Sequence, residues 1–174
     1  MHTIRACSGL GAIELMVTLT ILAILLALAA PRMSQTLERQ RLTGTTHSLL
    51  NALHQARSEA VKRNHRVTLC PSQDGEWCRE DGEWSEGWIL FADTGSTGQR
   101  QPDDELIAYQ ALATGASITP NQPVEHYVSY VARGTTRRTS GALQMGSLWV
   151  CVEGRGRRVI VSSVGRPRSE PASC

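Results

Sequence analysis

Residues 9–32, with the sequence GLGAIELMVTLTILAILLALAAPR, decide how the chain is organised. From Leu10 to Ala30 this stretch is an apolar run of 21 residues that a single charged residue, Glu14, interrupts. As a helix it would be roughly 31 Å long, which is enough to cross the hydrocarbon core of a bilayer. We therefore predict a membrane-spanning helix at residues 10–30, preceded by a short polar leader at residues 1–9.

A cleaved secretory signal peptide is the alternative for this segment. Its small-residue cleavage site would follow the apolar run, and Ala27-Leu28-Ala29 is a weak match. Glu14 argues against this alternative, because a carboxylate inside a membrane helix is costly and as a rule functional. Glu14 either lies near enough to the interface to reach water or pairs with a cationic group.

The start of the stretch, Gly9-Leu10-Gly11-Ala12-Ile13-Glu14-Leu15, resembles the G-F-T-L-I-E-L processing motif of type IV prepilins and pseudopilins. The resemblance implies that a prepilin peptidase cuts after Gly9 and methylates Leu10. It also implies that Glu14 pairs with the free amine of a neighbouring subunit during filament assembly. Leu10 and Gly11 depart from the usual Phe and Thr. By the same resemblance the protein is anchored in a bacterial inner membrane, with a periplasmic head, before it joins a type IV pilus filament.

Residues 31–64 are predicted to continue the helix with an amphipathic pattern. Five apolar residues recur at spacings of seven, four, three and four, which is typical of one buried helix face, and Asn64 is a candidate C-terminal cap. Residues 56–64 resemble the A-R-S-E-A-I-K-R-N segment of the GspH/FimT-like pseudopilins. We interpret Arg57 and Glu59 within it as solvated charges without a catalytic role. The apolar face consists of Leu42, Leu49, Leu53, Ala56 and Ala60.

Beyond Asn64, short runs rich in Val, Ile, Trp, Tyr and Thr predict strands, which Gly, Pro, Asp and Ser separate. Because no further long helical pattern follows, residues 65–174 predict an antiparallel β head with one buried core. The expected fold is α+β and type IV pilin-like, with the long N-terminal helix packed on this head. The predicted strands are residues 66–70, 88–92, 105–110, 127–131, 147–152 and 157–163.

The cysteines predict two disulfides in an oxidising compartment. Cys7 lies in the leader and would leave with it, so four cysteines remain. Cys70 and Cys78 flank a turn-forming stretch, and a bridge between Cys151 and Cys174 would tie down the chain end. We favour these two pairs over the two alternative pairings. A zinc site is disfavoured because there is no C-x-x-C pair, and no metal or cofactor is expected.

The charges are distributed unevenly although the formal net charge is only +2. Residues 72–105, the acidic block, hold ten acidic and two basic residues, whereas residues 125–174 hold eight arginines and three acidic residues. One interpretation is a solvated surface on which these arginines pair with the acidic block. The other interpretation is an anion-binding site.

The aromatic residues Trp84, Trp88 and Phe91 lie in a stretch that resembles a W-x-x-G-W-x-x-F segment of the same subgroup. We interpret them as core anchors.

The C-terminal Gly165-Arg166-Pro167-Arg168 resembles the G-R-x-R motif of DNA-binding FimT-like pilins. It is expected on a loop after the last predicted strand, where two guanidiniums would bind phosphates without reading the sequence. This implies a minor type IV pilin that contributes to DNA uptake in natural transformation. The alternative is a structural pseudopilin of a type II secretion system that binds fellow pseudopilins and no DNA. Candidate additional DNA contacts are Arg137, Arg138, Arg155, Arg157 and Arg158.

The sequence offers no catalytic constellation, since neither G-x-S-x-G nor H-E-x-x-H occurs in it. We therefore expect no enzymatic activity. The expected partners are DNA, other pilin subunits, the prepilin peptidase and the inner membrane.

Overall fold

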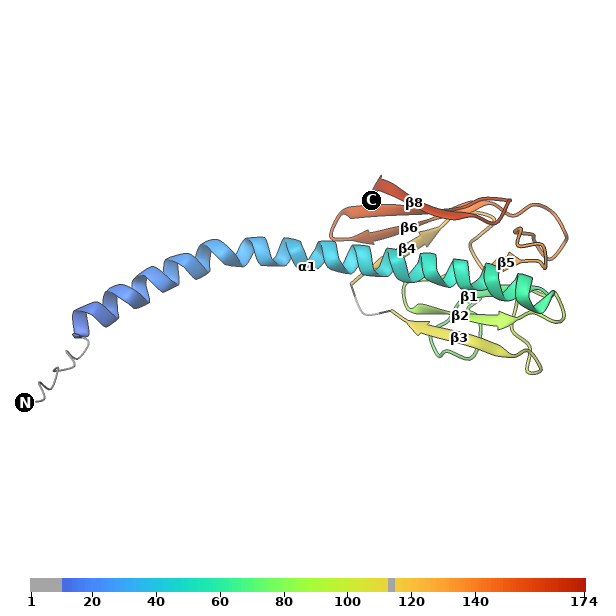
Figure 1. The fold of residues 1–174 in the computed structure, drawn as a ribbon, viewed down its shortest axis with the longest axis horizontal. Helices are drawn as coiled ribbons and strands as arrows, with labels where there is room; N and C mark the ends of the chain where they lie inside the picture. Colours follow the sequence, from blue (N-terminus) through green and yellow to red (C-terminus); the bar gives the residue numbers. More distant parts are fainter. Residues whose placement is uncertain (1–10, 113–114) are drawn as a thin grey trace, which may run out of the picture. The chain divides into compact units, whose positions relative to one another are not determined.

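The computed structural model of the chain describes residues 11–112 and 115–174, and at residues 27–32 the backbone alone. The described residues form one long helix, α1 (Ala12–Arg63), followed by eight β-strands (Figure 1). They make up two compact units that divide between Leu37 and Glu38. Gly9, Leu10 and Cys7, on which the predictions of processing and of the leader rest, lie outside the described residues.

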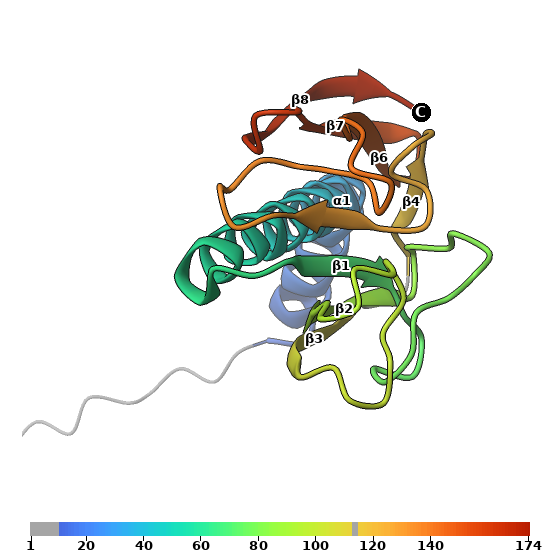
Figure 2. The same cartoon turned by 90° about the vertical axis from the view of Figure 1, so that its right-hand side faces the viewer.

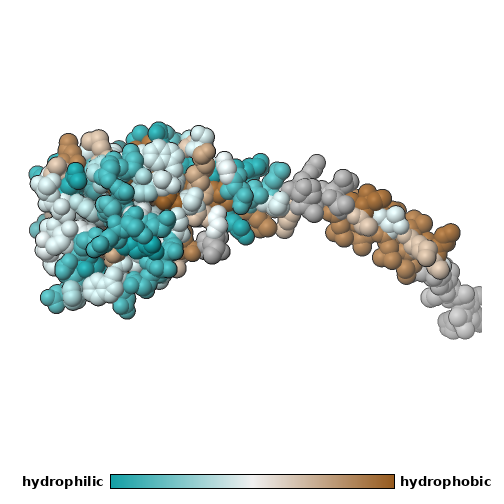
Figure 3. All heavy atoms as spheres, turned by 180° about the vertical axis from the view of Figure 1, so that it is seen from behind, coloured by the Kyte–Doolittle hydropathy of each residue, from teal (hydrophilic) through white to brown (hydrophobic). Residues whose placement is uncertain are grey.

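The first unit consists of the N-terminal part of α1. Its large apolar side chains from Ile13 to Leu26 are exposed, and Figure 3 shows them as an apolar surface along the helix. Within the part of the chain that the structure describes, no helix reaches the length and apolar character needed to cross a membrane. The span predicted from Leu10 onward therefore stays a prediction.

The second unit begins with the C-terminal part of α1, whose predicted apolar face is confirmed. All five residues of that face are buried, and Leu49, Leu53, Ala56 and Ala60 are fully so. The helix ends as the sequence predicts, with Asn64 in the left-handed region at a φ of 51°. The His65 N–H donates to the Ala60 carbonyl (3.2 Å) and the Asn64 N–H to the Val61 carbonyl (3.3 Å), which is the Schellman pattern of helix termination.

Two four-stranded antiparallel sheets complete this unit, in the orders β3-β2-β1-β5 and β4-β6-β7-β8. Figure 2 shows α1 running between them. Their inner faces bury Val, Leu, Ile and aromatic residues against α1, and Trp84 and Trp88 are buried there as predicted. Phe91 is also buried, but in a second cluster with Cys70 and Ile89, so the single core expected from the sequence is divided. The strands are β1 (Val67–Pro71), β2 (Gly87–Ala92), β3 (Leu106–Ala111), β4 (Ser117–Pro120), β5 (Val128–Tyr130), β6 (Gly146–Val152), β7 (Arg155–Val161) and β8 (Pro167–Ser173).

Six of the strands match the sequence predictions with shifted ends, and two were not predicted. The missed strands, β4 and β8, carry Pro120, Pro167 and Pro171. Both lie at sheet edges, where a proline is tolerated because its missing N–H faces away from the neighbouring strand. Edge strands with prolines and polar residues lack the alternating apolar pattern from which a strand is recognised.

The two favoured disulfide pairs are present. Cys70 bonds Cys78 with a Cα–Cα distance of 5.5 Å, and Cys151 bonds Cys174 with a Cα–Cα distance of 6.0 Å. The second bridge joins the last residue of the chain to β6, while β8 pairs with β7 along its whole length. Covalent and hydrogen bonds therefore hold the segment that carries the C-terminal arginines.

Candidate nucleic-acid interface

The G-R-P-R motif lies where β7 turns into β8. The Gly165 N–H donates to the Ser162 carbonyl at 2.8 Å, and Gly165 has a φ of 78°. Ser162 Oγ donates to the Arg166 carbonyl (3.0 Å) and accepts the Arg166 N–H (3.1 Å). The loop expected from the sequence is thus only a tight turn at 162–166. Arg168 belongs to strand β8, where it pairs with Ile160.

Gly165 is required at this turn for two reasons. Its positive φ is disfavoured for residues with a Cβ, and a Cβ there would collide with the carbonyl oxygen of Gly134. From the other side, Arg57 Nη1 on α1 donates a hydrogen bond to the Gly165 carbonyl at 3.0 Å. Arg57 is half-buried and reaches across the unit to this turn, so the interpretation as a solvated charge was wrong.

In the motif, Arg166 precedes and Arg168 follows a buried proline, and both arginine side chains are exposed to solvent. Pro167 is buried opposite Val161, whereas Arg166 and Arg168 are exposed. Residues at alternate positions of an extended segment point to the same side. Neither guanidinium has a carboxylate partner among the described residues. The pair can therefore bind an anion without first breaking an ion pair.

A neighbouring loop, residues 131–145, lies against this turn. Thr136 Oγ1 donates to the Ser162 carbonyl (2.9 Å), and the Thr136 N–H donates to the Ser163 carbonyl (3.3 Å). Figures 1 and 2 both show the loop beside the β7–β8 turn. Arg66 fixes part of it, because its Nη1 donates to the carbonyl of Arg137 at 3.0 Å.

This loop adds three arginines whose side chains have no carboxylate partner in the described part of the chain. Arg133 and Arg138 are exposed and Arg137 is half-exposed. The predicted contacts had included Arg137 and Arg138 but not Arg133. Arg133 is one of the eight arginines of residues 125–174. The contact of Gly134 with Gly165 shows that this part of the loop reaches the turn, which the sequence does not reveal. We call Arg133, Arg137, Arg138, Arg166 and Arg168 the arginine edge.

The other three candidates, Arg155, Arg157 and Arg158, lie in β7 and already have partners. Arg158 forms an ion pair with Glu170 and lies over the Trp149 ring at 5.9 Å. Arg155 lies 3.9 Å from Glu38, and Arg157 donates to Ser169 at 3.2 Å. Strand alternation puts Arg155 and Arg157 on the sheet face of the buried Val159 and Val161, opposite Arg158 and Arg168. Arg155 and Arg157 therefore do not share a surface with Arg168. Arg158 lies on the same face as Arg168, but its charge is already paired with Glu170.

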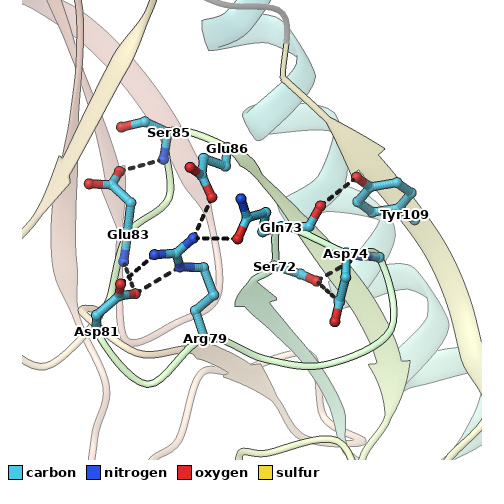
Figure 4. Close-up of polar contacts among 10 residues, drawn as sticks. Ser72, Gln73, Asp74, Arg79, Asp81, Glu83, Ser85, Glu86 and Tyr109 are labelled. Atoms are coloured by element: carbon cyan, nitrogen blue, oxygen red, sulfur yellow. Dashed lines mark hydrogen bonds and ion pairs between the residues drawn. The ribbon is translucent and has the colours of Figure 1, made fainter.

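Some of the carboxylates in the acidic block pair with an arginine of the same block. Figure 4 shows Arg79 between carboxylates. Its Nε donates to Asp81 (2.9 Å), and its guanidinium also forms an ion pair with Glu86. The hydrogen bond from Arg79 lowers the pKa of the Asp81 carboxyl to about 2. Among the described residues no arginine of residues 125–174 pairs with this block. The interpretation that the two blocks neutralise each other was wrong.

The family model described as Type II transport protein GspH matches residues 45–165. The chain belongs to the GspH family. Its fold resembles the crystal structure of the type IV minor pilin FimU from Pseudomonas aeruginosa, with a TM-score of 0.56 and 18% identity over 76% of this chain and 97% of that one. It also resembles the minor pseudopilin EpsH of the Type 2 Secretion System of Vibrio cholerae, with a TM-score of 0.51 and 13% identity over 75% and 97% of the two chains. No curated protein matches the sequence.

Membership of the GspH family supports a role as a minor pilin or pseudopilin. The family and the fold are those of structural pilin subunits. In the described residues of this GspH-family chain, His, Cys, Asp and Glu form no group of three that could hold a metal ion. The chemistry that the arginine edge offers is cationic: guanidinium groups fork onto phosphate or carboxylate oxygens with two parallel hydrogen bonds.

Proposed function

We propose that this chain is a minor type IV pilin that binds DNA through its C-terminal arginines and contributes to DNA uptake in natural transformation. The observation that carries the proposal is the pair Arg166 and Arg168, which are exposed and have no carboxylate partner among the described residues. They lie at a turn that hydrogen bonds from Arg57 and Thr136 hold. A stiff turn lowers the cost of ordering two long side chains on phosphate oxygens. Arg133, Arg137 and Arg138 would extend the contact.

Binding should follow the DNA backbone and not the base sequence. The described part of the second unit has no helix free to enter a groove, because α1 is packed between the sheets. Arginine contacts to phosphate carry no sequence information by themselves. A few such contacts support micromolar or weaker affinity per subunit, and several copies in one filament would raise it by avidity.

The test is a fluorescence-anisotropy titration of the full-length chain, in mild detergent, with two duplexes of unrelated sequence. We expect similar affinities for both duplexes. A plot of log affinity against log salt should have a slope between about −2 and −4.5, since each of two to five phosphate contacts contributes about −0.9. No binding at low salt would favour the alternative, a structural pseudopilin of a type II secretion system, which the family description also fits.

Processing of the N-terminus is the first step that we propose for assembly. A prepilin peptidase would cut after Gly9 and methylate Leu10, because the motif at residues 9–15 resembles the prepilin signal. Replacing Gly9 with Val should leave the full precursor in the membrane fraction, since the peptidase is expected to need the absence of a side chain. Mass spectrometry of the wild type should find N-methylated Leu10. An intact leader on the assembled protein would contradict this proposal.

Anchoring in the inner membrane is proposed for the helix that follows. The exposed side chains from Ile13 to Leu26 are apolar except at Glu14, Thr18 and Thr20, and both threonine hydroxyls donate to helix carbonyls. A helix that is apolar on all sides requires apolar surroundings. The head would then lie in the periplasm before the subunit enters the filament.

Glu14 is proposed to pair with the N-terminal amine of an adjacent subunit. Replacing Glu14 with Ala should permit insertion into the membrane but reduce recovery in sheared filaments at least tenfold, because the amine would lose its counter-charge in an apolar setting. Immunoblots of membrane and filament fractions measure both quantities. Replacement of the exposed Thr18 is the matched control. Normal filament recovery for Glu14→Ala would instead support the alternative that Glu14 lies near the membrane interface and reaches water.

A further inference from the structure

Arg57 is connected to the arginine edge although it lies 108 residues away from it in the sequence. Its Nη1 donates to the carbonyl of Gly165 at 3.0 Å. Among the described residues it has no carboxylate partner, in contrast to Arg63 on the same helix, which pairs with Glu59 and Glu105. Its one recorded hydrogen bond is thus to the backbone of the turn.

Two glycines let this contact form. A Cβ at Gly134 would lie 3.1 Å from Arg57 Nε and 3.1 Å from Val61 Cγ2, and a Cβ at Gly165 would collide with the Gly134 carbonyl. Arg57, Gly134 and Gly165 are therefore in successive contact, from α1 through the 131–145 loop to the β7–β8 turn. Both glycines have positive φ, 71° and 78°, so the close approach uses conformations in which a side chain is disfavoured.

The turn has little packing of its own. Val164 and Arg166 are exposed, Ser163 is half-exposed, and Gly165 contributes only backbone. Besides the packing of Gly134 on Gly165, hydrogen bonds from Thr136 and Arg57 hold the turn from the rest of the described unit. Loss of the Arg57 contact would leave the Gly165 carbonyl unpaired in a buried position, which is unfavourable.

The charge of Arg57 is not neutralised by the buried residue beside it. Tyr130 is fully buried, and its hydroxyl has no hydrogen-bond partner among the described atoms. Burial raises the pKa of this phenol, while the nearby Arg57 charge acts in the opposite direction. Tyr130 therefore stays neutral at physiological pH, and the positive charge beneath the turn remains.

We propose that Arg57 is a positioning residue for DNA binding, which holds the Gly165 carbonyl and thereby fixes the direction in which Arg166 and Arg168 leave the turn. This inference rests on the proposed DNA-binding function. A positioning role for Arg57 differs from a direct contact with DNA, because a positioning residue changes the affinity without changing the number of phosphates that are bound.

The test compares Arg57→Met and Arg57→Lys with the wild-type full-length chain. The matched control is Arg39→Met, which removes the same charge from an exposed position of the same helix. Arg57→Met should lower DNA affinity about tenfold, because a hydrogen bond from a charged donor is lost, with an unchanged salt slope. Arg57→Lys retains a charged donor and should stay within about threefold of wild type, as should Arg39→Met.

Amide hydrogen exchange tests the positioning without any DNA. In Arg57→Met, exchange in the segment of residues 162–166 should become about tenfold faster, while strands β6 and β7 exchange as in wild type. A salt slope reduced by about 0.9 would make Arg57 a phosphate ligand and overturn the inference. Unchanged exchange at the turn, or faster exchange throughout the sheet, would also overturn it. Absence of DNA binding by the wild type would refute the proposed function, and exchange would still decide whether Arg57 holds the turn.

Discussion

The double change Arg166→Gln with Arg168→Gln should abolish most DNA binding by the full-length chain while the head stays folded. Each guanidinium–phosphate contact is expected to contribute about 0.9 to the log–log salt slope, so the slope should become about 1.8 less steep. If the two proteins bind equally at 1 M salt, this difference in slope corresponds at 50 mM salt to a loss of affinity of about 200-fold. Both side chains are exposed and have no carboxylate partner among the described residues, so stability should change little.

The matched control is Arg155→Gln with Arg157→Gln. It removes the same charge from the same hairpin, but from the opposite face of β7. We expect this variant to bind within about threefold of wild type, because the long-range effect of net charge is screened by salt. An equal loss in both variants would show that total charge and not the turn controls binding. If the variant Arg166→Gln with Arg168→Gln binds DNA as tightly as the wild type, the alternative function, a structural pseudopilin of a secretion system, would be favoured.

The helix and the hydrophobic core could be predicted from the sequence because each depends on local pattern. The spacing of Leu42 to Ala60 identified the buried face of α1, and Asn64 identified its end. Trp84 and Trp88 were recognised as core residues, as their burial confirms. β8 was missed because Pro167 and Pro171 are uncommon in strands, and only its pairing with β7 makes it one.

The arrangement of the arginines could not be predicted, because it depends on register and on contacts between distant segments. A run such as Arg157-Arg158 reads as one basic cluster, yet neighbouring strand residues point to opposite faces. Likewise, helix periodicity places Arg57 at the border of the buried face of α1 but does not reveal which backbone group it meets. The carbonyl of Gly165 becomes its partner only when the β7–β8 turn packs over Gly134.

Contacts of its own carboxylates explain why the acidic block leaves the arginine edge free. Several of its carboxylates are engaged locally or by α1: Asp74 accepts the N–H groups of Glu76 and Trp77, and Glu105 accepts two hydrogen bonds from Arg63. These contacts hold the pKa values of Asp74 and Glu105 below their ordinary range. Opposite charges in one sequence thus form separate surfaces, and the basic one keeps its capacity for an external anion.

Replacement of Trp84 with Ala should have the largest effect on stability. Trp84 is fully buried in the core between the sheets and α1, and its Nε1–H donates to the Glu125 carbonyl at 2.7 Å. The substitution should lower the free energy of unfolding by about 3–5 kcal/mol, from the lost burial and the cavity that remains. The corresponding decrease in Tm for a unit of this size is about 10–20 °C.

Trp77 provides the matched control because it is the same residue type in the same acidic block but is 44% exposed. Its recorded ring contact is with the Arg100 guanidinium, 5.4 Å from the ring centroid, and such exposed contacts contribute about 0.5–1 kcal/mol. Trp77→Ala should therefore lower Tm by only a few degrees in thermal unfolding of the full-length chain. If Trp84 instead served as a platform for stacking bases, its loss would weaken DNA binding well below the unfolding temperature and leave Tm nearly unchanged. A core anchor gives the opposite result, with DNA affinity retained at 10 °C and a large decrease in Tm.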